Sequence, residues 1–411
     1  MKIFIFISFL FLIDLYFYFG TIDVIGKVFN NIFVYKYLYW IISVLLYVFL
    51  IYIAFIPDKE TTHIRVNKNV VYVSIFTIFF FSKLIGSIPL LLDDVFRFFK
   101  FVYNIFTTPS INHDIGRLDF LKKSALLFFS TLSLTFLSGI VWGRYNFKKN
   151  YQDIFIERWP EEINGYKIIH ISDLHLGSFN SIDKLEKVVE LINNEYPDMV
   201  VFTGDLVNTY YHEALPYVNT LKKIKAKYGK FSILGNHDYG DYAGIKRSSK
   251  AWQDNFNQLI KLQKAVGFDI LLNESRDIII NGNRVNLVGV ENWGDGNFNK
   301  DGDLEKAMKS VDDNLPTILL SHDPSHWSNV VLKSNYKIDL QLSGHTHGMQ
   351  FGIEVPGFKW SPSQYRYKQW AGLYEDSKRQ IYVNRGLGHL AYAGRVGIMP
   401  DISILSIKTK I

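Results

Sequence analysis

The chain has 411 residues, of which 48% are hydrophobic and 20% charged, and its formal net charge is +6. These averages hide a division, because residues 1–143 contain 23 of the 33 Phe but only 12 of the 45 Lys and Arg. The composition predicts a membrane part followed by an ordinary globular part, and excludes a soluble cytosolic enzyme, a disordered chain and a fibrous repeat. The nearly neutral second part argues against a nucleic-acid partner. The cysteine-free sequence rules out disulfides, thiolate metal sites and cysteine nucleophiles.

Four apolar runs in residues 1–143 approach the length of about 20 residues that a bilayer requires. They predict membrane helices at about 2–20, 37–55, 70–92 and 120–142. The first run is not interpreted as a signal peptide, because it has no small-residue cleavage site and further spans follow it. We therefore expect a multi-pass integral membrane protein whose partner is the lipid bilayer.

Two charged residues, Asp14 and Lys83, lie within the first and third runs. Ionisable groups in a membrane suggest function, and the alternatives are a buried pair that locks two helices together or side chains that reach the interface. The aromatic and cationic stretch 95–102 is either a helix on the membrane surface or a loop. Gly139 and Gly143 form a single GxxxG pattern, which is weak evidence of helix pairing.

The distribution of basic residues leaves the orientation open. Four spans place the N-terminus and the globular part on the same side, and the connecting segments then carry seven Lys or Arg on each side. The positive-inside rule therefore favours neither orientation.

Residues 144–166 are interpreted as a linker and residues 167–411 as a globular domain. Short apolar runs alternate with amphipathic stretches, which indicates βαβ units and a largely parallel sheet. The expected helices are 182–194, 212–227 and 250–266. The expected strands are 167–172, 199–203, 231–234, 277–280, 285–290, 317–320, 339–342, 381–384 and 402–407.

Polar side chains that bind metals follow five of the apolar runs. Ligands of an open α/β sheet bind beyond the carboxyl ends of its strands, so these blocks are expected to meet at one rim. The blocks are Asp173-Leu174-His175, Gly204-Asp205, Gly235-Asn236-His237-Asp238, Ser321-His322-Asp323 and Gly344-His345-Thr346-His347-Gly348.

The candidate donors are two Asp, one Asn and four His, with His237 in addition, which is too many for one metal ion. Oxygen and imidazole donors without thiolate suit Mn, Fe, Zn or Co. A carboxylate can bridge two ions about 3.5–4 Å apart, the spacing of two-metal phosphatases. The sequence therefore predicts two divalent metal ions.

The order of these blocks resembles the calcineurin-like metallophosphoesterase superfamily over about residues 168–407. The block around His345 and His347, together with the stretch 382–388, resembles a bacterial membrane-anchored branch similar to enzymes that hydrolyse UDP-2,3-diacylglucosamine. Met349 departs from the branch, which commonly has Gly at that position, and this leaves the shape of the substrate wall in doubt.

The resemblance implies a four-layer αββα sandwich and assigns the metal ligands. Asp205 would bridge the two ions. The first ion would be held by Asp173, His175, Asp205 and His347, and the second by Asp205, Asn236, His322 and His345.

The expected reaction is attack of a metal-bridging hydroxide on phosphorus. His237 is expected to be a catalytic residue that faces the phosphate rather than a ligand. Asp238 either orients His237 or caps a helix.

Further residues near these blocks have two interpretations each. His170 is expected to pack within its strand and Asn292 to form a turn, whereas His326 is left open. His389 either lies outside the site or contacts substrate. The loop 359–370 either contacts the membrane or a diphosphate headgroup, or covers the core with its aromatic residues.

The preferred function is a membrane-anchored phosphohydrolase acting on a phosphate-containing small molecule or lipid. One alternative is a hydrolase of soluble phosphodiesters or nucleotides that the spans merely anchor. Another is a non-catalytic membrane sensor or scaffold. The resemblance to enzymes of nucleotide-linked lipids favours a cytoplasmic catalytic domain.

Overall fold

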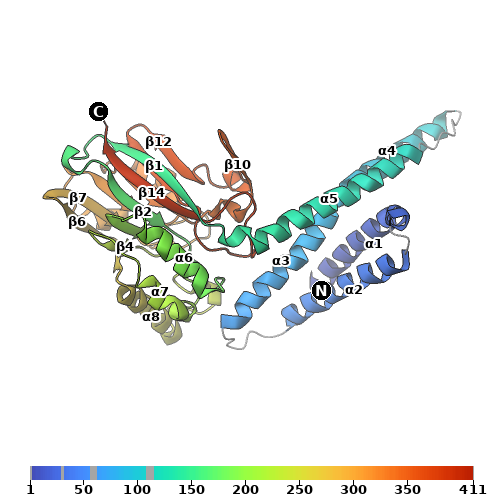
Figure 1. The fold of residues 1–411 in the computed structure, drawn as a ribbon, viewed down its shortest axis with the longest axis horizontal. Helices are drawn as coiled ribbons and strands as arrows, with labels where there is room; N and C mark the ends of the chain where they lie inside the picture. Colours follow the sequence, from blue (N-terminus) through green and yellow to red (C-terminus); the bar gives the residue numbers. More distant parts are fainter. Residues whose placement is uncertain (1, 29–31, 56–62, 108–114, 411) are drawn as a thin grey trace. The chain divides into compact units, whose positions relative to one another are not determined.

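A computed structural model describes residues 2–28, 32–55, 63–107 and 115–410. The chain divides into a helical unit that ends at Ser138 and a second unit that runs from Gly139 to the C-terminus and also includes residues 62–67. The helical unit contains α1 (Lys2–Val28), α2 (Ile32–Phe55), α4 (Ile88–Phe106) and most of α3 (His63–Gly86) and α5 (Ile115–Val141) (Figure 1).

Four stretches have the length and composition of membrane spans, as the sequence predicts. They are Ile5–Lys27, Tyr35–Tyr52, Val70–Phe106 and Gly116–Tyr145. The third differs from the expected helix at 70–92, because it contains both α3 and α4 with a break at Ser87. Pro89 lies in the first turn of α4, where its missing N–H is tolerated, and a proline disfavours continuing a helix through it. Residues 95–102 lie in α4, so this stretch is a helix and not a loop.

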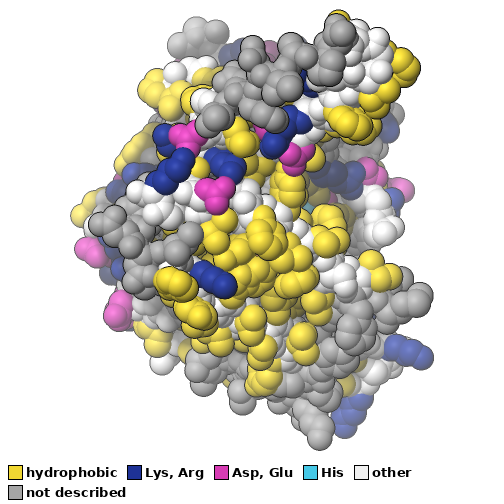
Figure 2. Space-filling view, turned by 90° about the vertical axis from the view of Figure 1, so that its right-hand side faces the viewer, with side chains coloured by type: hydrophobic (Ala, Val, Ile, Leu, Met, Phe, Trp, Pro, Cys, Tyr) yellow, Lys and Arg dark blue, Asp and Glu magenta, His cyan; other side chains and the backbone are white. Residues whose placement is uncertain are grey.

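Large apolar side chains remain exposed on the membrane helices. Phe19, Phe33 and Leu45 are each more than 60% exposed. Figure 2 shows hydrophobic side chains gathered on one face, with acidic and basic side chains grouped beside them. Ion pairs of the helical unit include Lys122–Asp23 and Lys27–Asp119, whose charged atoms are 2.9 and 3.3 Å apart. Exposed apolar surface of this extent suits lipid rather than water.

Asp14 and Lys83 form a buried ion pair, with 2.5 Å between Lys83 Nζ and Asp14 Oδ1. Tyr47 donates a 2.9 Å hydrogen bond to the carboxylate, and Tyr39 donates one of 2.8 Å to the Asp14 carbonyl. Lys83 also donates to the Ser43 hydroxyl at 3.1 Å. The pair therefore ties α1, α2 and α3 together, which agrees with the interpretation of a lock between helices.

Two six-stranded sheets form the centre of the second unit. The first sheet has the order β1-β14-β2-β3-β4-β5 and the second β12-β13-β9-β8-β7-β6. The strands of the first are β1 (Lys148–Ile156), β14 (Asp401–Thr409), β2 (Tyr166–Ile171), β3 (Met199–Phe202), β4 (Lys230–Ser232) and β5 (Asp269–Ile270). Those of the second are β12 (Gly372–Asp376), β13 (Arg379–Val383), β9 (Leu340–Ser343), β8 (Thr317–Leu320), β7 (Asn283–Gly289) and β6 (Glu274–Ile280).

The central strands of each sheet are parallel, as expected. Strands β2 to β5 run parallel in the first sheet, and β7, β8, β9 and β13 in the second. Strand β14 is antiparallel to β2, and β6 and β12 are antiparallel edge strands.

Three hydrophobic clusters separate four layers. Side chains of both sheets, such as Ile168 and Leu320, form the central cluster. The outer face of the first sheet packs against α6 (Ile182–Asn193) and α8 (Lys250–Val266), and that of the second against α9 (Leu304–Met308) and α10 (Ser325–Asn329). This is the expected αββα sandwich.

Two expectations for individual elements are wrong. The proposed linker 144–166 contains β1, which pairs in parallel with β14 along its whole length. Its polar sequence from Lys148 to Asp153 suits an exposed edge strand, and for that reason does not show the apolar pattern of a strand. The helix expected at 212–227 is a 3₁₀ segment (Tyr211–Tyr217) and a single turn, α7 (Val218–Leu221), because Pro216 interrupts it.

Replacement of Lys83 by Met is expected to destabilise the protein by about 3–5 kcal/mol, because it leaves the Asp14 carboxylate buried without a cation. The double variant Asp14→Asn/Lys83→Met should recover most of the lost stability. The apparent melting temperature of the full chain in detergent measures both effects. A Lys83→Met protein as stable as the wild type would contradict the structural role of the pair.

Candidate metal centre

The sequence-predicted donors lie at the carboxyl ends of strands from both sheets. Strands β2, β3 and β4 lead into the segments with Asp173, Asp205 and Asn236, and β8 and β9 lead into those with His322 and His345. The structure brings all seven candidate donors to one rim. The donors meet at one rim, as expected, but strands of both sheets end at this rim.

Five of the seven donor residues have left-handed backbone conformations, which are uncommon for residues other than glycine. Their φ angles are 51° for Asp173, 45° for His175, 59° for Asp205, 71° for His345 and 50° for His347. Each such residue costs of order 1–3 kcal/mol, and strain of this kind concentrates at functional sites.

Gly204 allows two of the strand-end loops to meet. Its φ is 94°, and a Cβ there would lie 2.3 Å from the Gly235 nitrogen. A larger residue would separate the Asp205 loop from the Asn236 loop.

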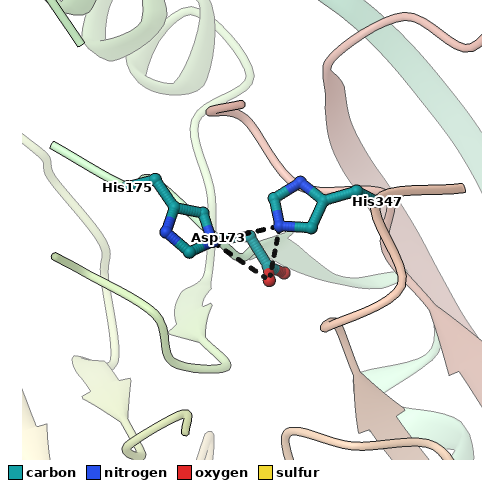
Figure 3. A group of neighbouring side chains, drawn as sticks. All are labelled: Asp173, His175 and His347. Atoms are coloured by element: carbon teal, nitrogen blue, oxygen red, sulfur yellow. Dashed lines mark hydrogen bonds and ion pairs between the residues drawn. The ribbon is translucent and has the colours of Figure 1, made fainter. Parts of the chain in front are cut away.

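Asp173, His175 and His347 form the first donor group (Figure 3). The Nε2 atoms of His175 and His347 are 3.0 Å apart, and His347 Nε2 is 3.3 Å from Asp173 Oδ1. Each of the three side chains is at most 9% exposed.

Asp205, His322 and His345 form the second group. Asp205 Oδ2 lies 3.3 Å from His322 Nε2 and 3.5 Å from His175 Nε2, so this carboxylate lies between the two groups. His322 Nε2 is also 3.2 Å from Asn236 Oδ1 and 3.2 Å from His345 Nδ1.

Three of the histidines are oriented by a contact on the ring nitrogen that points away from the cluster. This contact turns the other ring nitrogen toward the cluster. His322 Nδ1 is 2.6 Å from the Thr203 carbonyl, and His175 Nδ1 is 3.1 Å from Asn208 Oδ1. His345 uses Nε2 instead, 2.8 Å from the Tyr367 hydroxyl. A metal-binding imidazole is oriented in this way by a partner on its second nitrogen.

The charges of this buried cluster are strongly coupled. Burial opposes ionisation of Asp205, but His322 and His237 hold the pKa of its carboxyl below the usual range. Burial would lower the pKa of His322, yet the Asp205 carboxylate raises it to about 10. A protonated imidazole therefore balances the carboxylates at neutral pH, and a divalent cation would replace that proton. The donor set of oxygen and imidazole nitrogen fits Mn, Fe, Zn or Co.

His237 lies at the edge of the cluster. Its Nδ1 is 2.7 Å from the Asn208 carbonyl, and the residue forms a third possible ligand group with His175 and Asp205. Its backbone N–H donates to Asp205 Oδ1 at 2.8 Å. The geometry therefore allows His237 either to face a bound phosphate or to join the ligands.

Asp238 has neither of the two expected contacts. Its carboxylate accepts backbone N–H bonds from Asp205, Leu206 and Gly235 at 2.8–2.9 Å, so it fastens the Asp205 loop to its own turn. Burial and the Asp205 charge raise the pKa of Asp238 to about 7. The Asn208 carbonyl, rather than Asp238, orients His237.

Sequence reasoning missed four residues that support the cluster. Asp323 belongs to a recognised block but was given no role, and its Oδ2 lies 3.4 Å from His345 Nε2. Asn208 follows Asp205 by three positions, and that position is its only signal in the sequence. Tyr367 belongs to the loop 359–370, so this loop reaches the site through His345. Arg395 has no sequence signal at all. It is fully buried, and its Nη2 lies 3.3 Å from His347 Nδ1.

The remaining candidates lie outside the donor groups. His170 contacts the Thr203 hydroxyl at 2.9 Å, and His326 contacts the Ser321 hydroxyl at 3.0 Å. The Asn292 carbonyl accepts hydrogen bonds from the backbone N–H groups of Asp301 and Gly302 at 2.9 and 3.0 Å, which close the base of the loop between them. His389 is buried beside Tyr145, and Met349 is 48% exposed.

Comparison with known proteins finds two matching families. The family described as calcineurin-like phosphoesterase matches residues 166–349, and that described as the transmembrane domain of a probable calcineurin-like phosphoesterase matches residues 1–144.

Relatives extend this similarity over most of their own length. Metallophosphoesterase YkuE of Bacillus subtilis is 32% identical over 61% of this chain and 82% of its own. A metallophosphoesterase of Helicobacter pylori is 28% identical over 80% of this chain and 85% of its own. The UDP-2,3-diacylglucosamine pyrophosphatase LpxG of Chlamydia trachomatis is 28% identical over 55% of this chain and 79% of its own. With its membrane helices and its strand-end cluster, the chain is a multi-pass membrane protein that belongs to the calcineurin-like phosphoesterases, a family of phosphoester hydrolases.

Proposed function

We propose that this protein is a two-metal phosphohydrolase that acts on a lipid-linked phosphate or diphosphate. The observation that carries the proposal is the position of Asp205, whose carboxylate lies within 3.5 Å of imidazoles from both donor groups. The first ion would be held by Asp173, His175, Asp205 and His347, and the second by Asp205, Asn236, His322 and His345. Manganese is the first ion to test.

The bound cations would lower the pKa of a water and neutralise charge on the phosphate oxygens. The residues of the chain have separate tasks in the same step. After the water has released one proton to the solvent, its oxygen bonds to phosphorus and the bond from phosphorus to the leaving oxygen breaks. The His237 imidazolium gives that oxygen a proton. Asn208 holds the His237 ring in position through the bond from Nδ1 to its carbonyl.

Two features support a lipid-linked substrate. The chain enters the catalytic unit directly from α5, so a candidate membrane span is covalently continuous with the phosphoesterase. The name of the LpxG relative describes a pyrophosphatase of a nucleotide-linked lipid. A soluble phosphodiester or nucleotide is the alternative substrate, and detergent-micellar lipid phosphates assayed beside nucleotides distinguish the two.

Asp205→Asn is expected to lose one or both metal ions, because two cations then repel each other without the bridging negative charge. Elemental analysis of the purified full chain measures the loss. Full occupancy together with normal turnover would rule out the two-metal assignment.

His237→Ala is expected to keep both ions and to lower kcat by about 10²–10⁴-fold, because it removes the proton donor but no ligand. The same elemental analysis, with an aryl phosphodiester as substrate, separates the two effects. Metal loss in this variant would instead identify His237 as a ligand.

We also propose that the catalytic domain faces the cytoplasm, where nucleotide-linked lipid precursors are found. The cysteine-free chain permits a direct test with single cysteines at Asn30, which the sequence assigns to the opposite side, and at Lys187, which is exposed on α6. Asn30 lies outside the described residues. An impermeant thiol reagent should label intact cells at position 30 but not at position 187. The reverse pattern would place the phosphoesterase outside the cell.

A further inference from the structure

The segment that leaves α5 is built into the rim of the metal centre. Gly139 and Gly143 face the chain around Arg395, and the Arg395 N–H donates to the Gly139 carbonyl at 3.2 Å. A Cβ on Gly143 would lie only 1.9 Å from the Arg395 carbonyl oxygen. The GxxxG pattern therefore allows a loop, rather than another helix, to approach closely.

Arg395 connects this contact to the candidate ligands. Its buried guanidinium donates to the carbonyls of Gly388 at 2.6 Å and Arg385 at 2.9 Å, and reaches His347 Nδ1. The Gly388 N–H in turn donates to the Asp173 carbonyl at 2.7 Å. The contact of Gly139 and Gly143 with the chain around Arg395 is the first anchor of this segment, and it therefore lies beside His347 and Asp173.

Tyr145 forms a second anchor on the other side of Arg144. Its hydroxyl is 2.5 Å from Asn180 Oδ1, and its ring lies 5.2 Å from that of Phe179 and 6.3 Å from that of His389. Phe179 and Asn180 follow closely after His175 in the chain. Arg144 is therefore held between the loop of His347 and the loop of His175.

Arg144 has donors without acceptors at this position. Its Nε and Nη1 atoms are buried, and no described residue accepts a hydrogen bond from either. The Nδ1 atom of His389 is likewise buried without a partner. The Arg144 guanidinium carbon lies 5.0 Å from the centre of the Tyr145 ring, and the centre of that ring is 6.3 Å from the centre of the His389 ring. Burial, and next the Arg144 charge, lower the pKa of His389 to about 3. Buried donors without acceptors are costly, and a guanidinium edge matches two oxygens of a phosphate.

We propose that Arg144, assisted by His389, binds the second phosphate of a lipid-linked diphosphate whose first phosphate lies at the metal centre. The inference rests on the proposed function and narrows its substrate class. Arg144 follows α5 by three residues and lies at the end of the fourth candidate span, where a long cationic side chain can reach the lipid headgroups. A phosphomonoester has no second phosphate for this site.

Geranyl diphosphate and geranyl monophosphate test the proposal, because they differ by one phosphate. Their dissociation constants are measured by calorimetry on the full chain in detergent with excess Mn²⁺. Arg144→Met should weaken binding of the diphosphate about 10–100-fold, because hydrogen bonds to a charged group are lost. The dissociation constant of the monophosphate should change less than about twofold. Arg144→Lys should recover part of the affinity. Lys148→Met is the matched control, since this exposed cation lies four residues further along the chain and should change neither constant.

Unchanged diphosphate binding in Arg144→Met would overturn the proposal, and so would an equal loss for both probes, which would place Arg144 at the first phosphate. Hydrolysis of an aryl phosphodiester by the wild type with Mn²⁺ is measured in parallel. Its absence would contradict the proposed function, whereas its presence together with an unaffected Arg144→Met variant would contradict only the role of Arg144.

Discussion

The arrangement of the catalytic unit depends on one buried carboxylate. Asp205 is 1% exposed and lies within 3.5 Å of imidazoles carried by both sheets. An isolated buried carboxylate would be prohibitively costly, and it is tolerated here because opposite charge surrounds it. The same requirement for opposite charge makes the cluster a receptor for divalent cations. The negative charge of Asp205, which the surrounding imidazoles stabilise, is therefore also the charge that would bridge the two metal ions.

The surrounding structure holds this cluster in a strained form. The left-handed residues at the strand ends turn side chains inward at an energetic cost, and backbone bonds to Asp238 keep the Asp205 loop in place. Arg395 does the same for the loops near His347 by donating to several carbonyls. Because the chain around Arg395 also packs on Gly139 and Gly143, the end of a membrane helix is part of this framework. The residues from Gly139 to Gly143 thereby belong to the framework around His347.

The candidate ligands could be predicted from the sequence because each follows an apolar strand, and the strand ends of an α/β domain meet. His347 and Asp173 are 174 positions apart in the chain, yet this rule joins them. The second sheet could not be derived in this way, since local patterns do not show which strands are neighbours. Strand β1 was hidden by its polar, edge-strand sequence. The role of Arg395 could not be predicted, because most of its partners are backbone carbonyl oxygens, which every residue possesses.

The number of metal ions bound by each chain is the most direct test of the central claim. The full-length protein, stripped with a chelator and titrated with Mn²⁺, should bind two equivalents per chain, and aryl phosphodiesterase activity should appear as both are filled. Binding of a single equivalent with full activity, or activity that persists without any divalent ion, would contradict the two-metal account.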